Sequence, residues 1–220
     1  MIEVVPTVVP NSPADIDAFF ERSRGFARTF HVDAADGIFA PNVTWMPPAG
    51  IRFPESDEYF YEAHLMVEHP EAVGNAFVAA GAKRIIAHAM AFESEDEAKH
   101  AFDAWKSNGA KEVGIALLID APLETIEPFV LSCDCVTLMS IPRIGVQGIP
   151  FDERAYGRVA DLHARYPELM IEVDGGIGVT QIATLARAGA RRFAVGSALS
   201  HAEDPASVYK TLVSSAQSGL

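Results

Sequence analysis

The sequence is poor in basic residues and has no long hydrophobic run. Only 17 lysines and arginines accompany 30 aspartates and glutamates, so the formal net charge is −13. That balance argues against nucleic acid or an anionic membrane surface as a partner. No apolar stretch approaches the length of a membrane span, and the N-terminus lacks the basic start and apolar core of a signal peptide. We therefore expect a soluble, cytoplasmic protein.

Cysteine is almost absent from the chain. The two cysteines, Cys133 and Cys135, lie in the segment LSCDCVTLMS. A C-x-C metal site is one interpretation, but we favour free thiols in a buried strand.

Short β-rich runs alternate with helical patterns about every 25 residues, which is typical of parallel α/β architecture. Eight such units, undivided by any linker, predict that residues 1–220 form a single (β/α)8 TIM barrel. A doubly wound open sheet is the alternative, but no G-x-G-x-x-G follows the first expected strand. The expected strands are 2–9, 27–33, 61–67, 84–90, 112–119, 135–140, 170–175 and 192–197. The expected helices include 13–23, 70–80, 94–107, 152–165, 180–188 and 204–215, and the proline-rich segment 41–57 is expected to be a loop.

Four residues with metal-binding side chains stand near the ends of three expected strands: His31, Asp33, His64 and Asp174. In a barrel of this kind the active site lies where the strands end. Two imidazoles and two carboxylates there predict one divalent metal ion, and zinc, iron(II), manganese and cobalt all suit that donor set. The two carboxylates could also act as an acid/base pair.

Glycine-rich loops follow the last two expected strands. Gly175 and Gly176 follow strand seven, and Gly196 and Ser197 follow strand eight. Loops in these positions commonly bind phosphate in such barrels, because glycine lets backbone N–H groups approach the anion. The two loops together predict a phosphate-binding site.

The chain resembles the ribulose-phosphate 3-epimerase family. The matching segments are HVD..DG.F.PN at 31–42, HLMVEHP at 64–70, APLE at 121–124, MS at 139–140, VDGGI at 173–177 and VGSAL at 195–199. The resemblance implies a metal-dependent epimerase that interconverts D-ribulose 5-phosphate and D-xylulose 5-phosphate through an enediolate. It also implies that His31, Asp33, His64 and Asp174 are the metal ligands, and that Asp33 and Asp174 are the acid/base residues. Family members are often oligomers, so a homo-oligomer is expected.

The chain departs from the family pattern at several positions. Thr7 replaces a serine in strand one, and the Met and His of M-D-G-H-F are lost in Ala35–Phe39. The asparagine-proline after strand five becomes Leu118-Ile119, and the glycine-rich loop after strand six becomes the segment 141–148, IPRIGVQG. Arg143 in that loop could contact phosphate directly. The residues expected to contact the phosphosugar are Thr7, His64, Arg143, Gly145, Gly175, Gly176, Gly196 and Ser197.

Two other classes of function compete with this interpretation. One is an epimerase or lyase that acts on another phosphosugar. A Schiff-base aldolase is disfavoured because it needs a lysine at the end of a strand, and the five lysines fall at strand starts or on helices. The other is a non-catalytic barrel that binds a phosphosugar. Two carboxylates suited to acid/base chemistry argue against it.

Overall fold

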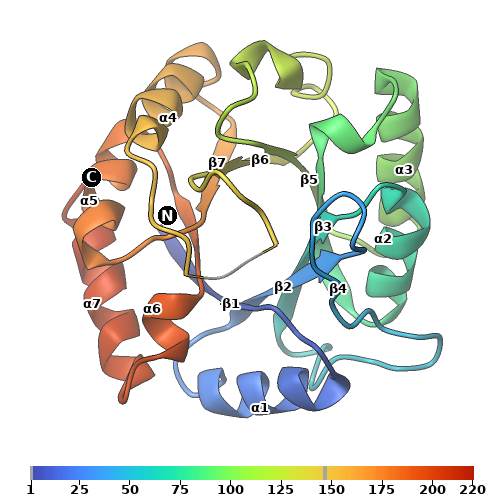
Figure 1. Cartoon of the computed structure of the whole chain (residues 1–220), viewed down its shortest axis with the longest axis horizontal. Coiled ribbons are helices and arrows are strands. Elements are labelled where there is room, and N and C mark those ends of the chain that lie inside the picture. Colours follow the sequence, from blue (N-terminus) through green and yellow to red (C-terminus); the bar gives the residue numbers. More distant parts are fainter. Residues whose placement is uncertain (1, 146–147) are drawn as a thin grey trace.

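The computed structural model describes residues 2–145 and 148–220. Eight parallel strands close into a barrel in which each strand pairs with its neighbours in sequence, and β1 pairs with β8. Helices surround the barrel (Figure 1). The expected (β/α)8 barrel is therefore confirmed. The strands are β1 Glu3–Val8, β2 Thr29–Ala35, β3 Phe60–Met66, β4 Ala82–His88, β5 Glu112–Leu117, β6 Cys135–Met139, β7 Met170–Asp174 and β8 Arg192–Val195.

Most crossover connections contain an α-helix. The helices are α1 Pro13–Ser23, α2 Pro70–Ala79, α3 Glu95–Ser107, α4 Arg154–Arg165, α5 Val179–Ala188, α6 Ser197–Ser200 and α7 Pro205–Gln217. Two short 3-10 segments are η1 Ala89–Ala91 and η2 Leu123–Ile126. The β5–β6 connection contains only η2, and the described β2–β3 connection contains no helix. The latter agrees with the loop expected at 41–57.

Local sequence signals fix several helix starts. In α1, Ser12 and Asp15 form a capping box and Pro13 occupies the first turn, where its missing N–H costs no hydrogen bond. In α3, the Ser94 hydroxyl accepts a hydrogen bond from the N–H of Glu97 at 3.2 Å. These caps give hydrogen-bond partners to backbone N–H groups that the first helical turn leaves free.

The strands bury both of their faces. In β2, every residue is buried: Phe30, Val32 and Ala34 join the apolar layer against the helices, and the alternate residues, His31 and Asp33 among them, face the barrel interior. In register, Thr7 pairs with His31, and Asp33 pairs with His64. The inward-facing residues at the strand ends are therefore polar and lie at one end of the barrel.

The loop between β6 and α4 lies across that end of the barrel (Figure 1). Its residues Ile141, Gly145, Gly148 and Ile149 line a cavity together with Asp33 and Asp174. The cavity is therefore bounded by strand ends below and by this loop above.

Both cysteines are free. Cys135 is the first residue of β6, but Cys133 precedes the strand, so the expectation that both lie in a buried strand is wrong for Cys133. Burial raises the pKa of the Cys133 thiol to about 12, which makes it a poor nucleophile. None of the described helices is long and apolar enough to cross a membrane.

Candidate metal and acid/base centre

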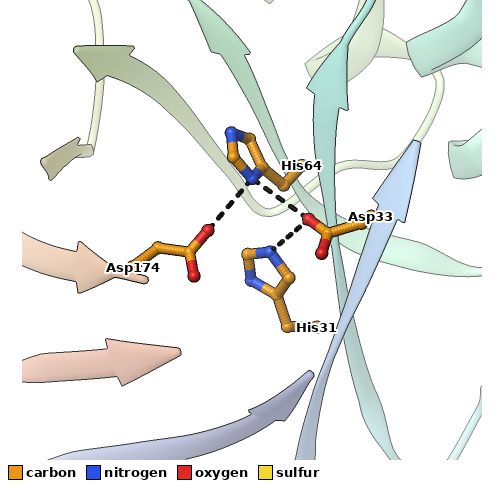
Figure 2. Close-up of side chains that lie close together, drawn as sticks. All are labelled: His31, Asp33, His64 and Asp174. Carbon is orange, nitrogen blue, oxygen red and sulfur yellow. Dashed lines mark hydrogen bonds and ion pairs between the residues drawn. The ribbon is translucent and has the colours of Figure 1, made fainter. Parts of the chain in front are cut away.

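Four side chains from three strands converge at the mouth of the barrel. His31 and Asp33 come from β2, His64 from β3 and Asp174 from the end of β7. One possible ligand atom from each lies within 4.8 Å of every other. Asp33 Oδ1 is 3.2 Å from both His31 Nε2 and His64 Nδ1, and Asp174 Oδ2 is 3.3 Å from His64 Nδ1. Figure 2 shows these side chains pointing toward a common centre.

Burial separates the imidazoles from the carboxylates. The His31 and His64 side chains are fully buried, whereas those of Asp33 and Asp174 are 10% and 13% exposed. Only the two aspartates of this group line the cavity. The arrangement places the imidazoles beneath the cavity floor and leaves both carboxylates in reach of a bound molecule.

The two imidazoles and Asp33 strongly perturb one another's pKa values, and Asp174 contributes to the shift of His64. Burial alone would lower the pKa of His64, but hydrogen bonds to Asp174 and Asp33 raise it to about 9. His31 also has a pKa well above its usual value: burial opposes the shift, and contacts with Asp33, Glu172 and Glu62 outweigh it. Burial would raise the pKa of Asp33, yet His31 and His64 hold it below its usual range. The centre therefore holds Asp33 as a carboxylate and favours positive charge on the two imidazoles.

The donor set fits a divalent metal ion. Two imidazole nitrogens and two carboxylate oxygens suit zinc, iron(II), manganese or cobalt. The outer nitrogen of each imidazole is also engaged: His31 Nδ1 lies 2.6 Å from Glu62 Oε1, and His64 Nε2 lies 2.9 Å from His88 Nε2. Partners of this kind orient metal-binding histidines. The remaining nitrogens, His31 Nε2 and His64 Nδ1, are the two that face the centre.

Most residues expected to contact the phosphosugar line the cavity beside the two aspartates. They are Thr7, Gly145, Gly175, Gly176, Gly196 and Ser197. Ser197 begins the short helix α6. His64 lies buried below the cavity. Arg143 is exposed and is not among the residues that line it. Val146 and Gln147 of the same loop lie outside the described residues.

Ser140, the residue after β6, fixes the turn at Gly175. The Ser140 hydroxyl donates hydrogen bonds to the carbonyl oxygens of Asp174 and Gly175, at 3.0 and 2.6 Å. At Gly176, φ is +63°, and a Cβ would lie 2.6 Å from the backbone nitrogen of Phe151. Both facts require glycine at position 176, since other residues are strained at positive φ and the Phe151 backbone leaves no room.

Charged residues continue into the barrel interior below the centre. Glu62 pairs with Arg84, whose Nε also lies 2.7 Å from Glu112 Oε2. Arg192 pairs with Glu3 at 2.8 Å and approaches Glu172 at 3.6 Å. The site residues predicted from the sequence did not include Glu62, Arg84 or Arg192. Glu62 lies two residues before His64, so both side chains point to the same, inward face of the strand. That spacing could have identified Glu62, because a carboxylate is rarely buried without a function or a partner.

Comparisons with known proteins agree with this geometry. Residues 6–200 match the model of the ribulose-phosphate 3 epimerase family. Ribulose-phosphate 3-epimerase from Schizosaccharomyces pombe is 30% identical, over 96% of this chain and 92% of the relative. Ribulose-phosphate 3-epimerase from Aquifex aeolicus is 34% identical, over 82% of this chain and 81% of the relative.

A solved structure of 3-hexulose-6-phosphate synthase from Salmonella typhimurium has the same fold. Its TM-score is 0.70 at 15% identity, and the match covers all of both chains. At that identity the likeness concerns the barrel alone. The match over residues 6–200 and the two relatives show more than a fold: this chain belongs to the ribulose-phosphate 3-epimerase family of isomerases.

Proposed function

We propose that the protein inverts C3 of a ketopentose 5-phosphate, interconverting D-ribulose 5-phosphate and D-xylulose 5-phosphate. The supporting observation is that Asp33 and Asp174 enter the centre from β2 and β7 and both line one cavity. In Figure 2 the two carboxylates flank His64 from opposite sides. Inversion needs one group to remove a proton from one face of the sugar and another to return a proton to the other face.

Asp33 is suited to take the proton because it is held as a carboxylate. Hydrogen bonds from His31 and His64 keep the pKa of Asp33 low against the effect of burial. One aspartate begins ionised and takes the C3 proton, and the other begins protonated and gives its proton to the opposite face of C3, so the two end with their protonation states exchanged. For the reverse reaction the two aspartates exchange roles, so a single site serves both directions.

The metal ion is part of the proposal. His31 Nε2, His64 Nδ1, Asp33 Oδ1 and Asp174 Oδ2 would hold zinc, iron(II), manganese or cobalt. When bound, such an ion supplies positive charge that stabilises negative charge on the substrate, which makes a C–H beside a ketone sufficiently acidic. His31 and His64 would be neutral when they hold such an ion.

The glycine loops would bind the phosphate. Gly175 and Gly176 after β7, and Gly196 and Ser197 after β8, line the cavity next to Asp174. Their backbone N–H groups can approach phosphate oxygens closely because three of the four lack a side chain. Thr7 and Gly145 would complete the contacts. Direct contact from Arg143 stays a hypothesis, as do the expected homo-oligomer and the cytoplasmic location.

The test is proton NMR of D-ribulose 5-phosphate with zinc- or manganese-loaded protein in D2O. Deuterium should enter at C3 as D-xylulose 5-phosphate forms. Asp33→Asn and Asp174→Asn should each reduce the rate by about 10²–10⁴-fold, the usual contribution of one acid/base group. Asp57→Asn, whose carboxyl is 86% exposed, is the matched control and should behave as wild type.

The metal content of each variant must be measured, because both aspartates are also proposed ligands. A variant that keeps its metal but loses exchange supports the acid/base role directly. Wild-type protein that binds metal but neither exchanges the C3 proton nor forms product would contradict the proposed reaction.

A further inference from the structure

The His31 ring connects two buried groups of polar side chains. Its Nε2 faces the proposed metal centre, 3.2 Å from Asp33 Oδ1. Its Nδ1 faces the barrel interior, 2.6 Å from Glu62 Oε1 and 3.6 Å from Glu172 Oε1. A neutral imidazole carries one proton, so whichever nitrogen holds that proton decides whether Nε2 can bind a metal.

Glu62 is itself fixed in place. One carboxylate oxygen faces His31 Nδ1, and the other pairs with Nη1 of Arg84. The Arg84 side chain is 3% exposed and that of Glu62 is fully buried, so neither has room to turn away. Arg84 is held from the far side by Glu112 at 2.7 Å. Arginine has only hydrogen-bond donors, so the Glu62 oxygen that faces Arg84 accepts a hydrogen bond. The other carboxylate oxygen can likewise only accept, and it faces His31.

Glu172 is equally buried but is placed differently. Neither of its oxygens has a hydrogen-bond partner among the described residues. It lies 3.6 Å from both His31 Nδ1 and Arg192 Nη1. His31, Glu62 and Glu172 could together offer ligands to a second ion. The two arginines already supply positive charge to both glutamates, so a second cation is not needed there.

We infer that Glu62, fixed by Arg84, is a positioning residue. It accepts a hydrogen bond from the Nδ1–H of His31, which keeps the ring proton on Nδ1 and leaves Nε2 free to bind the metal. The inference rests on the metal centre of the proposed function. It assigns a role to a charged pair in the barrel interior that lies outside the cavity and touches no substrate. Removing such a partner typically weakens metal binding about 10–100-fold.

Glu62→Gln tests the role at nearly constant shape. Arg84 offers only donors, so the new amide must turn its oxygen to Arg84 and its NH2 to His31. His31 Nδ1 would then have to accept, and its proton would move to Nε2. Glu172→Gln is the matched control, because it removes a carboxylate of equal burial that has no hydrogen-bond partner within residues 2–145 and 148–220.

Two measurements decide the matter, zinc titration calorimetry and 15N NMR of the His31 ring. We expect zinc affinity to fall about 10–100-fold in Glu62→Gln and to stay within about threefold of wild type in Glu172→Gln. In the zinc-loaded wild type, the His31 proton should be on Nδ1. In metal-free Glu62→Gln, the neutral ring should carry it on Nε2.

The outcomes separate the two proposals. A wild-type protein that binds no zinc overturns the metal centre and this inference together. Wild-type zinc binding that is unchanged in Glu62→Gln overturns the positioning role alone. If Glu62→Gln does not fold, the wild-type spectrum still decides, because a zinc-bound Nδ1 on His31 contradicts the inference.

Discussion

Nε2 of His64 lies 2.9 Å from Nε2 of His88, and the two rings stack with their centroids 5.0 Å apart. Burial and the neighbouring His64 hold the pKa of His88 well below its usual value, so His88 is neutral. The pKa of His64 is raised to about 9, so at neutral pH both ring nitrogens carry a proton: Nδ1 donates to the carboxylates and Nε2 donates to His88. The proton of His88 is then on Nδ1, which has no hydrogen-bond partner among the described residues.

Replacing His88 should weaken metal binding at the proposed centre, although His88 is not one of the four proposed ligands. His88→Ala leaves the buried Nε2–H of His64 without an acceptor, which costs about 1–3 kcal/mol of unfolding free energy. It also frees the His64 ring to turn, so zinc affinity should fall by about tenfold. Urea denaturation and calorimetry measure the two effects. His69→Ala, with a side chain 89% exposed, is the control. Equal results for both variants would show that the contact between the rings has no role.

The stability of the metal-free protein should fall with rising pH. The pKa of folded His64 is raised from 6.5 to about 9, so its protonated form is favoured by folding. That contribution is complete below about pH 6.5 and is lost as pH rises through about 9. Its size is on the order of 3 kcal/mol for this buried group. In the zinc-loaded protein both imidazoles are neutral ligands, so the same slope should be absent.

Thermal melts across this pH range, with and without zinc, measure the difference. The increase in Tm on adding zinc should be larger at the alkaline end, where protons no longer compete for the ligands. His64→Gln should reduce the slope of the metal-free protein and leave the part that His31 contributes. An unchanged slope in His64→Gln would show that His64 does not cause it.

The barrel could be predicted from the sequence because its periodic features are local. Runs of apolar residues bounded by turns placed all eight strands to within a few residues. The largest errors are at strand ends. Strand four was expected to run to Met90, but β4 ends at His88 and Ala89 begins a 3-10 segment. The pattern is silent there because the 3-10 segment, Ala89–Ala91, is as apolar as a strand in sequence, although Met90 is 61% exposed.

The convergence of the four centre residues could be predicted from geometry. The pairing of the charged residues in the barrel interior could not. His31, Asp33, His64 and Asp174 each stand near a strand end, and all strand ends of a parallel barrel meet at one face. Glu62 and Arg84 stand at or near strand starts, where charged residues are ordinarily solvated. Their pairing depends on β3 and β4 lying side by side, in register Glu62 to Arg84, and that register is visible only in the structure.

Arg143→Ala tests whether the altered loop contributes a cation to the phosphate site. If the contact exists, KM for D-ribulose 5-phosphate should rise about tenfold or more with kcat nearly unchanged, the pattern of lost uniform binding. Steady-state kinetics with the metal-loaded enzyme measure this. Arg187→Ala, an exposed position at the end of α5, is the control. An unchanged KM in Arg143→Ala would reject the contact and leave the backbone amides as the phosphate ligands.

Gly176→Ala should damage the protein far more than an ordinary glycine substitution. Alanine at φ +63° is strained, and its Cβ would lie 2.6 Å from the nitrogen and 2.9 Å from the Cα of Phe151. Backbone cannot yield as a flexible side chain does, so we expect a loss of about 1–3 kcal/mol in unfolding free energy. The displaced loop should also raise KM for the phosphosugar.

Gly157→Ala is the matched control for that substitution. Gly157 lies in α4, is exposed, and has nothing within 4 Å of an added Cβ. Alanine should stabilise this helix by about 0.5–1 kcal/mol, since glycine loses more conformational freedom on folding. Urea denaturation should therefore move the two midpoints in opposite directions. If Gly176→Ala instead matched Gly157→Ala in both stability and KM, the close approach of the β7–α5 turn to Phe151 would not constrain position 176, and the phosphate site would tolerate a side chain there.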